Sequence, residues 1–187
     1  MDVNRTNDET VKRVNENDKL HGYYFSFFED YDITTPQFTL RGRFIPCRIV
    51  DVIDGDSIVV VLSLFNHFYK YHVRINGVDT CETRSHNPEN RTLALRARCR
   101  VLGLITGNEY NDITIPKTTI KDILNNTVYI AYLDCKDFDK YGRLLADVYT
   151  TYDRTTSIAQ VLLDNHLAYP YTGETKLTEQ DQLQLLT

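Results

Sequence analysis

The sequence predicts an α+β fold that is mainly β, a five-stranded barrel accompanied by two to three helices. Runs rich in valine, isoleucine, threonine and tyrosine recur along the chain, as is typical of strands. A longer segment with helical spacing of its apolar residues follows the third run. The chain has 187 residues, of which 42% are hydrophobic, and this is enough for one domain with a substantial core.

The expected elements follow a recognisable order. They are strands at about 44–53, 57–64 and 69–78, a helix at about 89–105, strands at 127–133 and 143–150, and a helix at 156–166. Five strands with a helix between the third and the fourth make up the order of an OB-fold barrel. The last helix has Thr155, Thr156 and Ser157 before it as capping residues.

The remaining segments lie outside this plan. The predicted division is a flexible tail at 1–21, an aromatic arm at 22–43 packing on the barrel, the main domain at 44–173, and a C-terminal tail at 174–187. The arm is expected to add a strand to the barrel, and its aromatic residues at 23–38 suggest contact in a homo-oligomer or a platform for stacking bases. An insertion at about 106–126 is expected to form a short helix or a lid.

Two carboxylates lie at the bend of a predicted hairpin. Asp54, Gly55, Asp56 and Ser57 separate two runs of β-branched residues. An Asp-Gly pair between strands is most often a turn and nothing more. Acids held next to a core must be compensated, however, either by a hard cation such as Ca²⁺ or Mg²⁺ or by an arginine.

Two further segments supply the possible compensation. Arg74 lies inside an alternating apolar run, and Asp79 and Glu82 follow where that run ends. Arg143 begins a strand after the tight turn at 139–142. These residues are expected to meet at one end of the sheet. Arginine's planar fork matches the oxygens of a phosphate, so two arginines beside acids that bind a cation suit a phosphodiester.

These motifs resemble those of the staphylococcal-nuclease-like (thermonuclease) family. The resemblance rests on Asp54 to Ser57, Arg74 to Thr83 and Asp139 to Arg143 in the expected order, together with Leu167 to Tyr171, and it covers roughly residues 44 to 172. At Cys81 the sequence departs from the family pattern, which usually has proline there. Cysteine leaves the backbone before Glu82 less restricted, so the position of Glu82 is the least defined part of the resemblance.

The resemblance implies a role for each matching residue. Asp56, Asp79 and the backbone carbonyl of Thr80 would bind a catalytic Ca²⁺, supported by Asp54. Glu82 would hold or deprotonate the attacking water. Arg74 and Arg143 would grip the phosphate and stabilise its developing charge. Tyr169 and Tyr171 would pack along the nucleotide.

The implied activity is that of a Ca²⁺-dependent nuclease. It would hydrolyse phosphodiester bonds of DNA, RNA or both by attack of water on phosphorus, leaving 3′-phosphate and 5′-hydroxyl ends. The alternative is a catalytically inactive nuclease-like module that binds nucleic acid or protein. The retained acids argue against it, because a surface that only binds has no use for three converging carboxylates that repel phosphate.

Charge and cysteine content qualify this hypothesis. The chain has 21 basic and 26 acidic residues and a net charge of −5, which favours local attraction of short or single-stranded nucleic acid over long-range attraction of a duplex. The cysteines at 47, 81, 99 and 135 show no metal-binding spacing and are expected to be free thiols. Together with the absence of a signal-like segment in the first twenty residues, this favours an intracellular protein without membrane spans.

Overall fold

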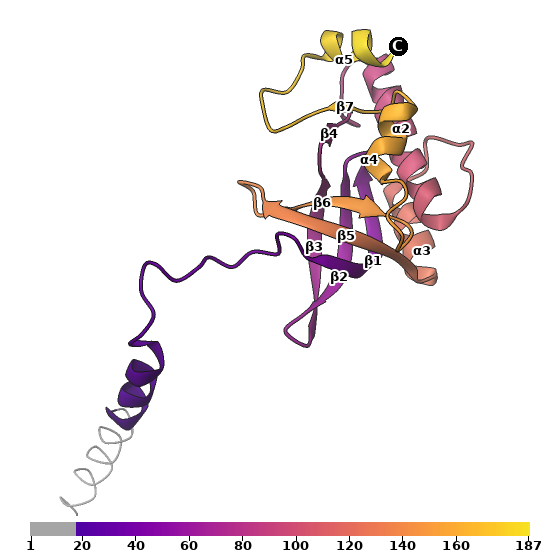
Figure 1. Ribbon diagram of the computed structural model, residues 1–187. Coiled ribbons are helices and arrows are strands. Elements are labelled where there is room, and N and C mark those ends of the chain that lie inside the picture. The colour runs from indigo at the N-terminus through magenta and orange to yellow at the C-terminus, as the bar shows by residue number, and fades with distance from the viewer. Residues whose placement is uncertain (1–17) are drawn as a thin grey trace, which may run out of the picture. The chain divides into compact units, whose positions relative to one another are not determined.

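Five strands form a closed barrel in the computed structural model, which describes residues 18–187 (Figure 1). The strands are β1 (Phe44–Asp54), β2 (Ser57–Leu64), β3 (His67–Ile75), β5 (Tyr129–Phe138) and β6 (Leu144–Tyr149). Neighbouring strands pair antiparallel, except that β3 and β6 pair parallel and close the barrel. The predicted α+β class and OB-fold barrel are confirmed.

The short strands β4 (Val78–Asp79) and β7 (Tyr169–Pro170) form a separate two-stranded sheet. The helices are α2 (Pro88–Thr106), α3 (Lys117–Asn126), α4 (Ile158–Asp164) and α5 (Glu179–Leu186). The two predicted helices correspond to α2 and α4. The insertion contains α3, and residues 179–186 form α5 instead of the flexible tail that the sequence suggested.

Residues at both ends of helix α2 explain where it begins and ends. Asn87 precedes it, and its side-chain oxygen accepts a hydrogen bond of 2.9 Å from the backbone N–H of Glu89. Pro88 occupies the first helical turn, where its missing N–H is not needed. Gly107 ends the helix with a φ of 72°, a left-handed conformation that glycine adopts without strain.

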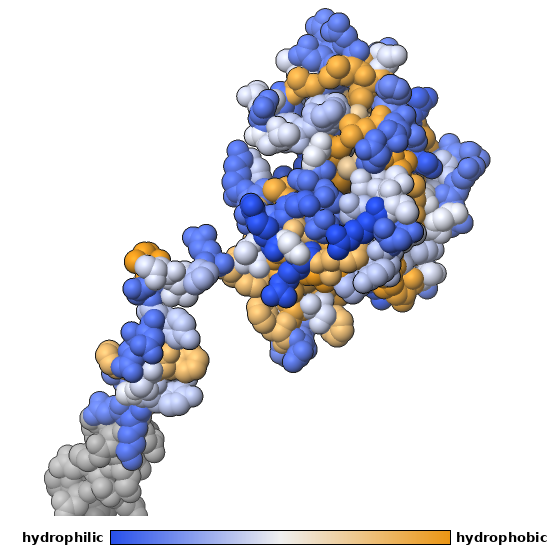
Figure 2. Space-filling view, in the orientation of Figure 1, coloured by the Kyte–Doolittle hydropathy of each residue, from blue (hydrophilic) through white to orange (hydrophobic). Residues whose placement is uncertain are grey.

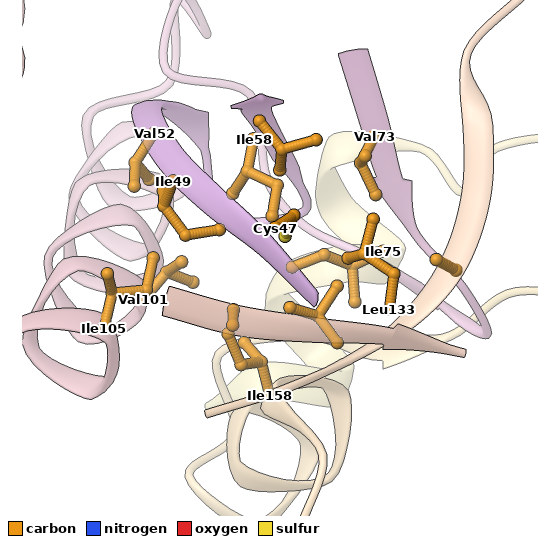
Figure 3. Packing of buried hydrophobic residues seen from close by; sticks show 14 of the residues in the cluster. Cys47, Ile49, Val52, Ile58, Val73, Ile75, Val101, Ile105, Leu133 and Ile158 are labelled. Carbon is orange, nitrogen blue, oxygen red and sulfur yellow. The ribbon is translucent and has the colours of Figure 1, made fainter. Parts of the chain in front are cut away.

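The barrel interior is filled by alternate residues of each strand. On β2, for example, Ile58, Val60 and Leu62 are buried in the core. Helix α2 covers one end of the barrel, and Figure 3 shows its Val101 and Ile105 on the side of Ile49 and Val52. The helix therefore packs directly behind β1, the strand that leads to the Asp54 turn.

The chain divides into two compact units after Phe38, and the second unit spans Thr39–Thr187. In the first unit, residues 18–28 form a helix, so this part of the predicted arm is not a strand. Its aromatic side chains from Tyr23 to Phe28 are 52–63% exposed, and Figure 2 shows hydrophobic and hydrophilic residues side by side on it. Most of the predicted tail at 1–21 lies outside the described residues. No helix within residues 18–187 combines the length and the apolar character needed to cross a membrane.

Candidate functional site

The turn between β1 and β2 lies against helix α2. A Cβ atom added at Gly55 would come within 2.5 Å of the Cβ of Ala97 and within 3.0 Å of the Thr80 side chain. Only glycine allows this approach. The carboxylate of Asp54 accepts a hydrogen bond of 2.8 Å from the Thr83 hydroxyl. The turn therefore connects the hairpin both to the helix and to the loop that follows β4.

Asp56 is buried and fully engaged in hydrogen bonds. Its Oδ1 accepts from the Ser57 hydroxyl at 2.9 Å. Its Oδ2 accepts from the backbone N–H of Thr80 at 3.1 Å and from the Thr80 hydroxyl at 3.0 Å. Donors on both oxygens stabilise the ionised form of a carboxylate. Asp56 is thus fixed in place relative to the segment that holds Asp79.

Arg74 bridges the two buried aspartates. Its Nη1 forms an ion pair with Asp56, and its Nη2 lies 2.5 Å from Oδ1 of Asp79. The three residues are 8%, 7% and 4% exposed for Arg74, Asp56 and Asp79 respectively. Charges this deeply buried must be paired, because each alone would lose its hydration without compensation. The arginine predicted to compensate the acids does so by direct contact.

Tyr169 supports Asp79 from the opposite side. β4 pairs with β7, which sets Asp79 opposite Tyr169, and the Tyr169 hydroxyl donates a hydrogen bond to Oδ2 of Asp79. Burial and this hydrogen bond raise the pKa of Tyr169. The residue is only 2% exposed, so its ring presents almost no surface to a nucleotide, and its role in substrate binding stays a prediction. Tyr171 does line the cavity, and its hydroxyl donates to the Glu174 carbonyl at 2.6 Å.

Glu82 contacts a lysine that the sequence did not indicate. Nζ of Lys176 lies 2.5 Å from Oε1 of Glu82 and 3.2 Å from Oδ2 of Asp79. Burial opposes the charged form, but the hydrogen bond to Glu82 and the charges of both acids outweigh it and raise the pKa of Lys176. The Glu82 side chain is otherwise exposed. Lys176 thus joins the candidate base to a candidate metal ligand.

Arg143 is oriented by the turn that precedes it. Its Nε lies 2.6 Å from Oδ2 of Asp139, and its backbone N–H donates to Oδ1 at 2.9 Å. Burial works against the ionised Asp139, yet the hydrogen bonds from Arg143 and Tyr141 hold the pKa of this carboxyl below its usual value. The Tyr141 ring lies beside the guanidinium, 5.6 Å from centroid to carbon. The parallel pairing of β3 with β6 brings Arg143 to the same end of the barrel as Arg74.

The predicted site residues converge on one cavity of about 340 Å³. Those that line it are Asp54, Asp56, Arg74, Asp79, Thr80, Glu82, Arg143 and Tyr171, with Cys81, Tyr141 and Lys176 in addition. Of the predicted residues only Tyr169 lies behind the cavity wall. Residues from four separate stretches of the chain therefore meet in one hollow with both acidic and basic groups.

The donor chemistry of this cavity suits a hard cation. Carboxylate and carbonyl oxygens are the ligands that Ca²⁺ prefers, and Asp56, Asp79, Glu82 and the Thr80 carbonyl are of that kind. Within residues 18–187, no group of three or more His, Cys, Asp or Glu side chains is gathered closely enough to hold a metal ion. Arg74 and Lys176 supply the positive charge between the acids instead. The oxygen donors are of the type that binds calcium, and in this structure the side chains of Arg74 and Lys176 contact the carboxylates.

Helix α5 braces the loop that holds Glu82. The Ser85 hydroxyl lies 2.5 Å from Oε1 of Glu179. The buried Gln182 donates to the Tyr169 hydroxyl at 3.3 Å and accepts from Nδ2 of Asn90 at 3.2 Å. Asn90 also lies 3.5 Å from the sulfur of Cys81, whose thiol has its pKa raised by burial. The loop that lacks the usual proline is thus held by packing and by side-chain hydrogen bonds.

These supporting residues were not found from the sequence. One signal was available, because Thr178 and Asp181 have the spacing of a helix cap. The Thr178 hydroxyl accepts from the backbone N–H of Asp181 at 3.2 Å and donates to its carboxylate at 2.6 Å. That pattern predicts a helix start at 179, although not the contact with Tyr169.

Comparison with known proteins gives one finding. A family model described as staphylococcal nuclease homologue matches residues 72–187, which is more than half of the chain. No curated protein matches the sequence significantly. The matched range includes Arg74, Asp79, Glu82 and Arg143, and it begins after the Asp54 turn.

Proposed function

Because the chain belongs to the staphylococcal nuclease homologue family, we propose that it is a Ca²⁺-dependent nuclease. It hydrolyses phosphodiester bonds of DNA, RNA or both, and leaves 3′-phosphate and 5′-hydroxyl ends. The observation that carries the proposal is the convergence of two arginines and four carboxylates on one cavity. Arginines suit the phosphate, and acids suit a cation and a water molecule.

In this proposal Glu82 is the general base. It accepts a proton from the water molecule as the water oxygen attacks phosphorus. The bond from phosphorus to the 5′ oxygen breaks, and this oxygen takes up a proton from solvent to give the 5′-hydroxyl end. Arg74 and Arg143 donate hydrogen bonds to the phosphate oxygens, where negative charge increases in the transition state. Asp139 keeps the Arg143 guanidinium oriented, so little ordering is required when substrate binds. Tyr171 contacts the nucleotide beside the cavity.

The Ca²⁺ ligands in this proposal are Asp56, Asp79 and the Thr80 carbonyl, with Asp54 behind them. When bound, the ion would act as a Lewis acid on the phosphate and lower the pKa of water. Thr80 links the two ligands, since its N–H and hydroxyl hold Asp56 while its neighbour in sequence is Asp79. Tyr169 fixes the orientation of Asp79 from behind.

One contact favours the alternative of an inactive binding module. Lys176 holds the Glu82 carboxylate at 2.5 Å, and a base that is neutralised by an ammonium group accepts a proton poorly. An active enzyme must therefore release this contact when substrate and metal bind. A binding module would keep it.

A cleavage assay separates the two functions. Labelled single- and double-stranded DNA and RNA are incubated with Ca²⁺, with Mg²⁺ and with a chelator. We expect cleavage with Ca²⁺ only, and a loss of about a hundredfold or more in rate for Glu82→Gln because the base is removed. Arg143→Lys keeps the charge but loses the planar fork, so it should also slow cleavage.

Lys117→Gln, on the exposed surface of α3, serves as the matched control and should cleave like the wild type. Cleavage in the chelator would contradict the role of calcium. Binding of nucleic acid without any cleavage under all these conditions would establish the inactive module instead.

Two broader parts of the proposal concern the whole protein. The exposed aromatic side chains between Tyr23 and Tyr31 suit a contact between copies of the chain. The mass from light scattering, divided by the mass of one chain, should therefore give more chains per particle for the full chain than for a chain without residues 1–38. The same number of chains per particle in both would contradict this. The four cysteines are buried and unpaired, which supports a reducing, intracellular setting.

A further inference from the structure

A second cavity lies on the outer face of β1, β2 and β3, apart from the candidate active site. Its volume is about 480 Å³. The floor is apolar and includes Val59 and Val61, one wall carries Lys70 and His72 of β3, and the other wall carries Lys121 of α3. None of these residues has a role in the proposed hydrolysis.

The register of the strands places this cavity next to Arg74. β3 pairs with β2 so that Arg74 is opposite Ser57, His72 opposite Val59 and Lys70 opposite Val61. Alternate residues of a strand share one face, and Val73 points into the core. Arg74, His72 and Lys70 therefore form one row along the outer face of β3, with steps of roughly 6.6 Å between them. Steps of this size suit the successive phosphates of an extended nucleic-acid strand.

One polar atom of the cavity lining lacks a hydrogen-bond partner in the part of the chain that the structure describes. Oδ1 of Asp51 is buried and has no hydrogen-bond partner within residues 18–187, while its Oδ2 lies 3.4 Å from Nζ of Lys121. A buried acceptor of this kind is costly unless a donor reaches it. The amino or ring N–H groups of a nucleobase are donors of the right size. Two lysines at the rim supply positive charge for phosphates.

We propose that this cavity is a subsite for a nucleotide of single-stranded nucleic acid, two nucleotides along the strand from the phosphate that is cleaved. Lys70 and Lys121 hold the phosphates, the base packs on Val59 and Val61, and Asp51 accepts a hydrogen bond from the base. A base can reach the apolar floor only when it is unstacked, which favours a single strand over a duplex. The inference rests on the proposed function, because Arg74 marks the position of the cleaved phosphate.

The net charge of the chain makes such a local site necessary. A protein with a net charge of −5 repels a polyanion at long range. Binding must then come from short-range contacts with a basic row. The row along β3 begins in the candidate active site and leads directly to the second cavity, so it provides those contacts where the substrate strand must lie.

The test is a measurement of binding. Labelled single-stranded oligonucleotides of increasing length are titrated with the full chain in chelator at several salt concentrations, and the dissociation constant is obtained by fluorescence anisotropy. For the double variant K70Q/K121Q we expect about tenfold weaker binding of the longer strands, and a decrease of about 1.4 in the slope of log K against log salt, because two phosphate contacts are lost. Dinucleotides, which are too short to reach the cavity, should bind as before.

Two further variants separate this result from a general effect of charge or folding. K117Q/K136Q loses the same charge outside the cavity and should bind like the wild type. K70R/K121R keeps the charge and should retain the affinity. Unchanged binding by K70Q/K121Q, or an equal loss in K117Q/K136Q, would overturn the proposal.

The outcome does not depend on catalysis. Weaker binding by K70Q/K121Q in a protein that cleaves nothing would support the subsite and contradict the proposed hydrolysis. Calcium-dependent cleavage together with unchanged binding by this variant would support the proposed hydrolysis and contradict the subsite.

Discussion

Lys176 is the residue that most alters the candidate site. It contacts Glu82 and Asp79, two acids that the proposed mechanism requires for a base and for a metal ligand. A bound cation and the lysine ammonium compete for the same carboxylate oxygens. If the site binds Ca²⁺ as proposed, removal of the lysine should change the affinity for the ion.

Lys176→Met is expected to tighten Ca²⁺ binding by about tenfold, because a positive charge near the ion is removed and two carboxylates are released. Isothermal titration calorimetry with CaCl₂ measures the dissociation constant directly. Lys136→Met is a matched control, since Lys136 also bridges two acids, Asp134 and Asp147, away from the cavity. Unchanged or weaker calcium binding by Lys176→Met would show that the lysine does not compete.

The hydrogen bonds of Asp139 predict how the stability of the protein depends on pH. Hydrogen bonds from Arg143 and Tyr141 depress the pKa of the folded-state carboxyl. Its stabilising effect is therefore complete above the unfolded-state pKa of about 3.9, and it is lost as pH falls through the lower folded-state value. Thermal unfolding should show the wild type more stable than Asp139→Asn at pH 6, with the difference shrinking below about pH 4. A difference that stays constant down to pH 2 would contradict this assignment.

At the scale of elements, the contact between the Asp54 turn and α2 depends on a glycine. Gly55→Ala would bring its Cβ within 2.5 Å of the Cβ of Ala97, so we expect a loss of stability of about 1–3 kcal/mol. Ala97→Gly alone should cost about 1 kcal/mol through helix propensity. In the double variant the collision with the Ala97 Cβ is absent and only the contact of 3.0 Å with the Thr80 side chain remains, so the two losses should not add. Urea unfolding measures this coupling, and simple additivity would mean that the turn shifts away at no cost.

Helix α5 closes a small apolar cluster of Cys81, Leu93, Ala94, Tyr169 and Leu186 beneath the site. Leu186→Ala should destabilise the protein by about 2 kcal/mol through the cavity that it leaves. The neighbouring Leu185 is 57% exposed, so Leu185→Ala should change stability by less than about 0.5 kcal/mol. Chemical denaturation of both variants tests whether α5 belongs to the folded unit, and equal effects would contradict it.

At the scale of the whole molecule, the sequence predicted what depends on local pattern. The strands that flank Asp54 and Asp56 alternate clearly, and Arg74, Asp79 and Glu82 lie within a short stretch, so their convergence follows from strand geometry. The burial of Tyr169 and the contact of Lys176 with Glu82 depend on how the chain returns 90 and 94 residues later. Such contacts are set by packing, which leaves no periodic signal. The helix at 18–28 was also missed, because aromatic residues are typical of strands.

The parallel pairing of β3 with β6 has a consequence for synthesis of the chain. Arg74 and Arg143 become neighbours only when the barrel closes, and β6 is the last of its strands to be made. A chain still growing on the ribosome carries the acids of the Asp54 turn long before it carries the second arginine. The two guanidinium groups therefore come together late, only after the last barrel strand has been translated and has paired with β3.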